Sequence, residues 1–317
     1  MKKISHSLRE RFIKDCKIPI SLVQDPYFDY YLETYESFYK SKTQYAVFCD
    51  LVERLGGEES FFKESKRITD SVIEAISSTE AYAYFSNMSL QEYSSNKSDI
   101  KQQNIYNQQN VGQAFASFDL SKANYNALKF INPEIVLNTN SYEDLMKLYT
   151  QEEYFINSKH IRQVIFGHLN PTRQLRIQSY IIQKRVIPEI LKFMPDTERI
   201  ISASEDEVVI KMLPFESITE NYINGLKNFK SGVPVKYTAF VLRQLGNKPY
   251  FFKEFGYKCK PPVEFKAVPQ NYFAECFKYY LKEEPSDFDM CAYHEGRVVK
   301  YLDPLFSNSG EVSDECF

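Results

Sequence analysis

The sequence is poor in the residues and motifs that mark several common classes of protein. None of its 317 residues is tryptophan, and it has only 10 glycines and 4 histidines. Neither G-x-x-x-x-G-K-[ST] nor G-x-G-x-x-G occurs, so a P-loop or Rossmann nucleotide site has no support. No serine stands in G-x-S-x-G, and the histidines are too scattered for a metal site, so neither a hydrolase elbow nor histidine-bound zinc is predicted.

Cysteine pairs and long apolar segments are missing as well. The six cysteines include no C-x-x-C pair, which favours reduced, buried thiols over zinc ligands or a disulfide framework. No run of 18 or more uncharged apolar residues occurs, and the N-terminal MKKISHSLRERF lacks the apolar core of a signal peptide. We therefore expect no membrane partner and a cytoplasmic protein.

An excess of positive charge is also absent. The net charge is −3 at pH 7, which argues against a protein held on nucleic acid by bulk charge but leaves room for a local basic channel. Hydrophobic residues make up 43% of the chain and aromatic residues 15%, values typical of a globular protein. The length suits two domains or one large core.

The first part of the chain is predicted to be helical. In DPYFDYYLETYESFYKSKTQYAVFCDLVERLGG and SFFKESKRITDSVIEAISSTEAYAYFSNM, apolar or aromatic residues recur at spacings of three and four. A polar stretch at about 93–113 has neither helical nor strand periodicity and is predicted to be a loop. We therefore place a helical N-terminal region at residues 1–105.

The middle region, residues 106–215, is predicted to combine strands and helices. An apolar strand at 114–119 is followed by helical patterns at 121–131, 141–149 and 153–193. In TERIISASEDEVVIKML, two β-branched segments flank a small acidic centre, which is typical of a hairpin.

The last region, residues 216–317, is predicted to mix both element types. Helical patterns cover 217–228 and QNYFAECFKYYLKEE. Hairpins are expected in VKYTAFVLRQLGNKPYFFKEF, turning at Gly246-Asn247, and in DMCAYHEGRVVKYL, turning at Glu295-Gly296. The chain is therefore predicted to be α+β, with antiparallel strands packed on helices.

Two acidic positions point to chemistry. Asp119 ends the strand at 114–119, where a charge is costly to desolvate unless it is paired or bound to a metal. Asp206 lies in the acidic turn SEDE. If the strand lies beside this hairpin, the two carboxylates meet at one end of the sheet and can bridge two divalent ions for phosphoryl transfer. We predict Asp119 and Asp206 as ligands of two Mg²⁺ ions.

The segment between these acids is basic. Residues 159–192 contain seven Lys or Arg against one acid, Glu189, which suggests an anionic partner. Arg162 and Phe166 lie one helical turn apart, so their side chains are expected to point the same way. The guanidinium could grip a triphosphate while a base stacks on the ring.

A second basic tract covers residues 227–266, with nine Lys or Arg against two acids and several interleaved aromatic residues. Cations mixed with aromatic rings suit a nucleic-acid backbone and its bases, so we predict a primer-template here. Taking both tracts, the predicted nucleic-acid-binding residues are Arg173, Arg176, Lys236, Arg243, Lys248 and Lys253.

The order and wording of these segments resemble the motifs of template-directed polymerases, above all those of family A DNA polymerases. Residues 119–126, DLSKANYN, are similar to the family's D-Y-S-Q-I-E-L-R. Arg162, Phe166-Gly167 and Asn170 follow its second motif, a basic residue, then F-G, then Y-G. The EDE at 205–207 before VVIKM is similar to its H-D-E, and also resembles the third motif of reverse transcriptases.

The resemblance implies an antiparallel palm-like sheet with a helical fingers insertion at 140–195, acting as a DNA polymerase in DNA replication. By it, Asp119 and Asp206 would bind the metals. Glu207, with its neighbour Glu205, would tune the metals or orient the primer. The implied substrate-binding residues are Lys159 and Arg162 for the triphosphate, Phe166 for the base, and Asn124 and Asn170.

The sequence departs from the family at three of these positions. Asn124 stands where the family has a ribose-sensing Glu, so the preferred sugar is left open. Asn170 replaces the Tyr that closes the fingers, and Glu205 replaces a His beside the primer end.

Each feature also has a simpler structural explanation. Asp119 could cap a helix beginning at Ser121, and the SEDE turn could be a solvated loop. The basic helix could be an exposed face, and Phe166 could belong to the core.

The sequence therefore predicts a compact Mg²⁺-dependent nucleotidyltransferase that extends the 3′ end of a primer-template with nucleoside triphosphates. No acidic exonuclease motif is evident, so proofreading is not predicted. The alternative is a catalytically inactive palm-like module that binds nucleic acid or a protein, and a third interpretation is a structural protein without a nucleic-acid role. Template type, oligomeric state and an accessory protein are left open.

Overall fold

The computed structural model describes residues 4–93, 104–213, 225–255 and 261–300. The chain divides into two compact units, the first made of Met1–Glu58 with Leu242–Phe317 and the second of Glu59–Val241. This division differs from the predicted boundaries at 105 and 215, because the N-terminal helices pack on C-terminal segments that are distant in the sequence.

The first unit combines N-terminal helices with C-terminal strands and a helix. Aromatic rings join the two parts, since Tyr35 and Phe38 lie 5.0 and 4.7 Å from the ring of Phe277, between centroids. The described elements of this unit are α1 (His6–Cys16), α2 (Tyr27–Thr34), α3 (Glu36–Tyr39), α4 (Ser41–Arg54), β5 (Phe251–Glu254), β6 (Val263–Lys266), α14 (Phe273–Tyr280), β7 (Cys291–His294) and β8 (Arg297–Lys300).

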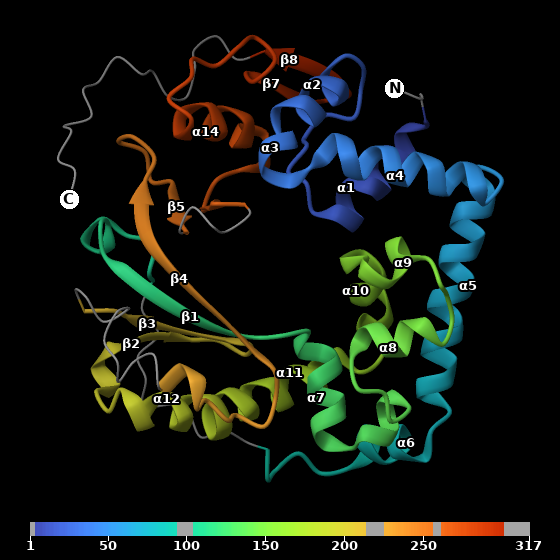
Figure 1. Cartoon of the computed structure of the whole chain (residues 1–317), viewed down its shortest axis with the longest axis vertical. Helices are drawn as coiled ribbons and strands as arrows, with labels where there is room; N and C mark the ends of the chain where they lie inside the picture. The colour runs from blue at the N-terminus through green and yellow to red at the C-terminus, as the bar shows by residue number, and fades with distance from the viewer. Residues whose placement is uncertain (1–3, 94–103, 214–224, 256–260, 301–317) are drawn as a thin grey trace. The chain divides into compact units, whose positions relative to one another are not determined.

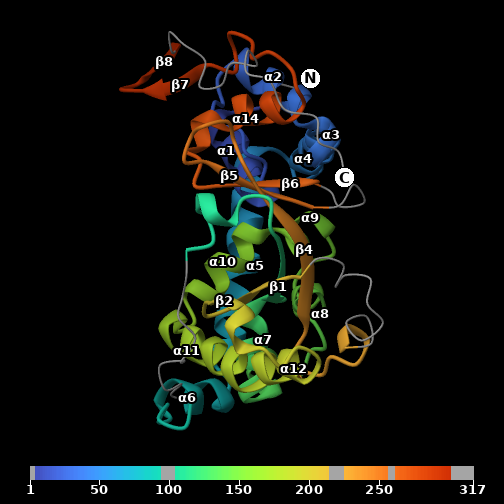
Figure 2. The same ribbon diagram turned by 90° about the vertical axis from the view of Figure 1, so that its left-hand side faces the viewer.

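The predicted hairpin at Glu295-Gly296 is confirmed. Strands β7 and β8 pair antiparallel, with His294 opposite Arg297. The two turn residues have φ angles of 47° and 80°, and two consecutive positive φ values define the turn that best matches the twist of paired strands. Figure 2 shows this hairpin standing out from the helices of its unit.

The second unit contains the predicted strand–helix–hairpin series. Its helices are α5 (Glu58–Ser77), α6 (Glu80–Asn87), α7 (Ala123–Ile131), α8 (Tyr142–Lys147), α9 (Glu153–Asn157), α10 (Lys159–Gly167), α11 (Pro171–Ile181) and α12 (Ile187–Phe193), with a π-helical turn at Ile182–Val186. Its strands are β1 (Ala114–Leu120), β2 (Ile200–Ala203), β3 (Glu207–Lys211) and most of β4 (Val235–Gln244). The helix predicted at 217–228 lies mostly outside the described residues.

The strands form a sheet in the order β2-β3-β1-β4-β5-β6, so the α+β class with antiparallel strands is confirmed. Strand β1 is central and pairs antiparallel with both β3 and β4. Because side chains alternate along a strand, Asp119 and Phe118 point to opposite faces. Helix α12 covers the Phe118 face (Figure 1), where the Phe118 ring lies 6.5 Å from that of Phe193.

The described cysteines and helices can be compared with what the sequence predicted about thiols and membrane segments. Cys16, Cys49, Cys276 and Cys291 are thiols, and all but Cys16 are buried. Burial raises the pKa of the Cys276 thiol, which makes it unreactive. In the described part of the chain, no helix is both long and apolar enough to cross a lipid bilayer.

The buried carboxylate of Asp289 fixes the C-terminal part of the first unit to α2. It accepts hydrogen bonds from the Tyr30 hydroxyl and from both N and Oγ of Ser286. We expect Asp289→Ala to lower the free energy of unfolding by about 3 kcal/mol, because these donors lose a charged acceptor. Urea denaturation followed by circular dichroism measures the loss.

Asp287→Ala is the matched control for this prediction. The Asp287 side chain is 78% exposed and pairs with Lys300 at 2.6 Å, and exposed ion pairs contribute only about 0–1 kcal/mol. Equal losses in the two variants would contradict the anchoring role of Asp289.

Candidate active site at the end of strand β1

Two carboxylates face each other across strands β1 and β3. Asp119, the last residue but one of β1, lies directly opposite Glu207 in the antiparallel register. Directly opposed residues point to the same face of the sheet with neighbouring Cβ atoms. Ser117, two residues earlier on that face, donates from Oγ to Glu207 Oε1 at 2.5 Å. The hydroxyl therefore fixes the Glu207 carboxylate on this face of the sheet.

Asp206 lies next to this pair in the hairpin turn. The backbone N–H of Leu120 donates to the carbonyl oxygen of Asp206 at 2.8 Å, which places the turn beside the end of β1. The turn is closed by Ser204 N–H donating to Glu207 O at 2.8 Å, and the Asp206 side chain is exposed. The predicted neighbourhood of strand and hairpin is confirmed, with Glu207 rather than Asp206 directly across from Asp119.

The donor set suits a hard cation in part. Carboxylate oxygens are ligands that Mg²⁺ prefers, and Mg²⁺ in nucleotide enzymes is commonly held by one or two carboxylates together with substrate phosphates. Among residues 4–93, 104–213, 225–255 and 261–300, no group of three or more His, Cys, Asp or Glu side chains is arranged to hold a metal ion. The acids at the end of β1 would therefore need further ligands, such as phosphate oxygens, to hold Mg²⁺.

Asp119 is not the N-cap residue of the helix that follows it. Helix α7 begins at Ala123, and its N-cap is Lys122, whose side chain makes no capping hydrogen bond. Lys122 has φ 46° and ψ 52°, a left-handed conformation that is uncommon for residues other than glycine. Lys17, Lys40 and Lys282 also have a positive φ, so this conformation does not by itself mark a functional site.

Lys122 and Arg162 converge on the buried ring of Tyr142. The Lys122 Nζ lies 5.4 Å from the ring centroid and the Arg162 Cζ lies 5.6 Å from it. Lys122 also forms an ion pair with Glu143. Burial lowers the pKa of both cations, and the charge of Arg162 lowers the pKa of Lys122 further. The cluster therefore holds two positive charges in a partly desolvated place where they repel each other.

Phe166 is a core residue in this structure. Its side chain is fully buried, and its ring lies 6.1 Å from that of Tyr142 and 6.5 Å from that of Tyr125. Phe166 and Arg162 both contact the Tyr142 ring, so their side chains point the same way, as the one-turn spacing predicted. Because Phe166 is buried, its ring exposes no face on which a nucleotide base could stack. Lys159 begins α10 and is half-buried.

Asn124 and Asn170, both predicted to contact substrate, join helices. The Asn124 side-chain oxygen accepts a hydrogen bond from Gln178 Nε2 of α11 at 2.5 Å. The Asn170 Nδ2 donates to the Tyr82 hydroxyl at 3.1 Å and to Ser86 Oγ at 2.8 Å, both on α6. These contacts fix the orientation of α11 relative to α6 and α7.

The predicted nucleic-acid-binding residues divide between the two units and differ in exposure. Arg176 and Lys236 are exposed in the second unit, and Lys236 lies directly opposite Asp119 on β4. In the first unit, Lys248 is exposed and Arg243 pairs with Glu254 at 2.8 Å. Two of the predicted residues are engaged within the protein instead. Lys253 is only 5% exposed, and Arg173 donates a hydrogen bond to the carbonyl oxygen of Met88 at 2.6 Å.

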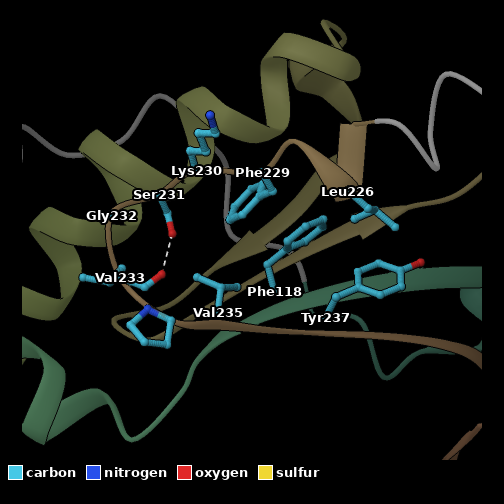
Figure 3. Close-up of a pocket in the computed structure, with 10 residues that line it drawn as sticks. Phe118, Leu226, Phe229, Lys230, Ser231, Gly232, Val233, Val235 and Tyr237 are labelled. Atoms are coloured by element: carbon cyan, nitrogen blue, oxygen red, sulfur yellow. Dashed lines mark hydrogen bonds between the residues drawn. The ribbon is translucent and has the colours of Figure 1, made fainter. Parts of the chain in front are cut away.

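A pocket of about 550 Å³ lies on the opposite face of the sheet from the acids. Phe118 and Tyr237 of the sheet and Phe229 line it (Figure 3), with Ser231 Oγ donating to Val233 O at 2.7 Å. The side chain of Lys230 points away from the rings in this view. Most of the lining is apolar, and none of the described residues that line it carries a carboxylate, so this pocket is not part of the candidate active site.

Comparison with known proteins adds no relative to these observations. No protein-family model, curated protein or solved structure matches the chain.

Replacing either of two arginines of the second unit by methionine should affect the stability of the protein differently. We expect Arg162→Met to leave the urea midpoint of unfolding unchanged or higher, because a desolvated cation beside Lys122 is removed and no carboxylate of the described residues pairs with it. Residues kept for function at a cost in stability behave in this way.

Arg173→Met is the comparison variant. We expect it to lower the free energy of unfolding by about 1–2 kcal/mol, because the partly buried carbonyl of Met88 loses its donor. The guanidinium contact with the Phe85 ring, at 5.3 Å, is lost as well. A clear loss of stability in Arg162→Met, equal to that in Arg173→Met, would show that Arg162 is a structural residue.

Proposed function

We propose that this protein is a palm-type nucleotidyltransferase that extends a nucleic-acid 3′ end by two-metal phosphoryl transfer. The observation that supports it most directly is the strand register, in which Asp119 lies opposite Glu207 and beside Asp206. The palm-like interpretation of the sheet, the fingers role of α8 to α12, and the DNA polymerase class belong to this proposal.

Asp119 and Asp206 would hold the Mg²⁺ ions. Such ions activate the attacking hydroxyl and neutralise charge on the leaving pyrophosphate. Glu207 would tune this site from its position opposite Asp119, with Ser117 keeping its carboxylate in place. Arg162 would bind the triphosphate, since a guanidinium pairs with phosphate oxygens through two parallel hydrogen bonds.

Lys236 would act on the nucleic acid. It is exposed, and it stands directly opposite Asp119 on the side of β1 away from Glu207. A cation there reduces the repulsion between a carboxylate and an approaching phosphate backbone. Arg176, also exposed in the second unit, would add charge for non-specific binding.

A catalytically inactive nucleic-acid-binding module is the second candidate function. It is favoured by Phe166 and Asn170, because the side chains predicted to stack the base and to replace the residue that closes the fingers are engaged in internal contacts. This candidate expects binding that weakens steeply as salt is added, without incorporation of nucleotides.

Primer extension with Mg²⁺ separates the two candidates. We expect Asp119→Asn and Asp206→Asn each to reduce the rate at least about 100-fold, because substitutions even of groups behind a metal ligand cost 10–100-fold. Glu207→Gln is expected to reduce it by about tenfold, since its role is indirect. Radiolabelled or fluorescent primers resolved on denaturing gels provide the measurement.

Glu198→Gln controls for a general loss of negative charge, because this exposed acid of the second unit lies outside the site. It should retain wild-type activity. No incorporation by the wild-type protein on DNA or RNA templates, together with salt-sensitive binding to the primer-template, would replace the enzymatic proposal with the inactive module.

A further inference from the structure

The side chains around Tyr142 contain donors that no described residue satisfies. The Tyr142 hydroxyl is buried and has no hydrogen-bond partner among residues 4–93, 104–213, 225–255 and 261–300. The Arg162 guanidinium makes no ion pair or hydrogen bond with the part of the chain that the structure describes, although it lies at the Tyr142 ring. Buried donors without acceptors cost stability. The Tyr142 hydroxyl and the Arg162 guanidinium could therefore both donate hydrogen bonds to the oxygen atoms of a ligand.

A second lysine–tyrosine pair, within helix α7, shows how such a pair looks when it is purely structural. Lys129 of α7 lies 6.0 Å from the ring centroid of Tyr125. Its Nζ donates to the carbonyl oxygens of Thr139 and Asn140 at 2.9 and 2.8 Å, and the Tyr125 hydroxyl donates to Thr139 O at 2.8 Å. Every polar group of that pair has a backbone partner, in contrast to the groups around Tyr142.

The charges of the Tyr142 cluster do not balance. Lys122 and Arg162 carry two positive charges, and Glu143 supplies one negative charge to Lys122. The Glu143 side chain is 32% exposed and the Lys122 side chain 30%, so solvent reaches both. An anion arriving from solvent would find Arg162 without a counter-ion among the described residues. It would find Lys122 paired with Glu143, which can move away because its carboxylate has no other partner in the described part of the chain.

We infer that Lys122, Arg162 and the Tyr142 hydroxyl form a polyphosphate-binding site in which Glu143 is an internal counter-ion that the ligand displaces from Lys122. A polyphosphate is the ligand class that fits, because it offers several charged acceptor oxygens to two cations and one hydroxyl. Within the proposed function, on which this choice of ligand rests, the site would receive the triphosphate of the incoming nucleotide. The left-handed backbone of Lys122 directs its side chain to this site from the end of the strand that carries Asp119.

Exchange of Glu143 for the ligand has a definite consequence for affinity. The carboxylate competes with phosphate for the same ammonium group, so removing its charge should strengthen binding. Removing either cation should weaken it. Loss of the hydroxyl alone should weaken binding by a smaller factor, because a neutral donor contributes less than a charged one.

Isothermal titration calorimetry with sodium tripolyphosphate tests this inference in EDTA buffer, without metal, primer or template. We expect Glu143→Gln to bind about tenfold more tightly than wild type, and Lys122→Met and Arg162→Met about tenfold more weakly. Tyr142→Phe should bind a few-fold more weakly. Lys129→Met is the matched control and should bind as wild type does, since its lysine already has carbonyl partners.

The outcomes separate this inference from the polymerase proposal. Binding that follows the expected order in a protein without primer-extension activity would support the site and reject the enzyme. Absence of tripolyphosphate binding, or equal affinity in wild type, Lys122→Met and Arg162→Met, would overturn the site. Unchanged or weaker binding by Glu143→Gln, with an unaltered circular dichroism spectrum, would overturn the counter-ion role.

Discussion

The antiparallel register of β1 between β3 and β4 is the constraint on which the candidate site depends. Hydrogen bonds along both edges of β1 fix it, and a shift of one residue would turn Asp119 to the helix-covered face. The buried rings of Phe115 and Phe118, on opposite faces, hold the strand in this register. Because of it, acids that are 87 positions apart in the chain, Asp119 and Asp206, come to one end of the sheet.

The same end of the sheet leads directly into a group of cations. Lys122 follows Asp119 by only three positions, and the left-handed backbone of Lys122 turns the chain into α7. Helices α8 and α10 bring Tyr142 and Arg162 to the lysine. The carboxylate of Asp119 and the partly desolvated cation of Lys122 thus lie close together in one stretch of the chain. Such an arrangement is costly for folding and is therefore a reason to assign it to binding or catalysis.

The contacts of the helices explain why several predicted ligands are internal. Asn170, Arg173 and Gln178 each hold α11 to a neighbouring helix or its C-terminal end, through hydrogen bonds to Ser86, Met88 and Asn124. A basic or amide side chain on a helix reads the same in sequence whether it contacts a ligand or a backbone carbonyl. Other members of the predicted set, such as Arg176, are exposed and, among the described residues, make no such internal contact that fixes α11.

The sequence by itself determined the element types and the positions of the main turns. Strand β1, the acidic hairpin and the Glu295-Gly296 turn follow from local patterns, because alternation, β-branching and turn chemistry act over a few residues. The sequence also marked Asp119, Asp206 and Arg162 as unusual in their local context. The resemblance to polymerase motifs then suggested a function that the local patterns alone do not indicate.

Tertiary structure decided which of these residues meet. It placed Glu207 directly across from Asp119, buried Phe166, and joined Lys122 to Tyr142 and Glu143, which lie on a separate helix. It also divided the chain differently, by packing α2 and α3 on C-terminal residues. These outcomes depend on contacts between distant parts of the chain, and no periodicity within a short window carries that information.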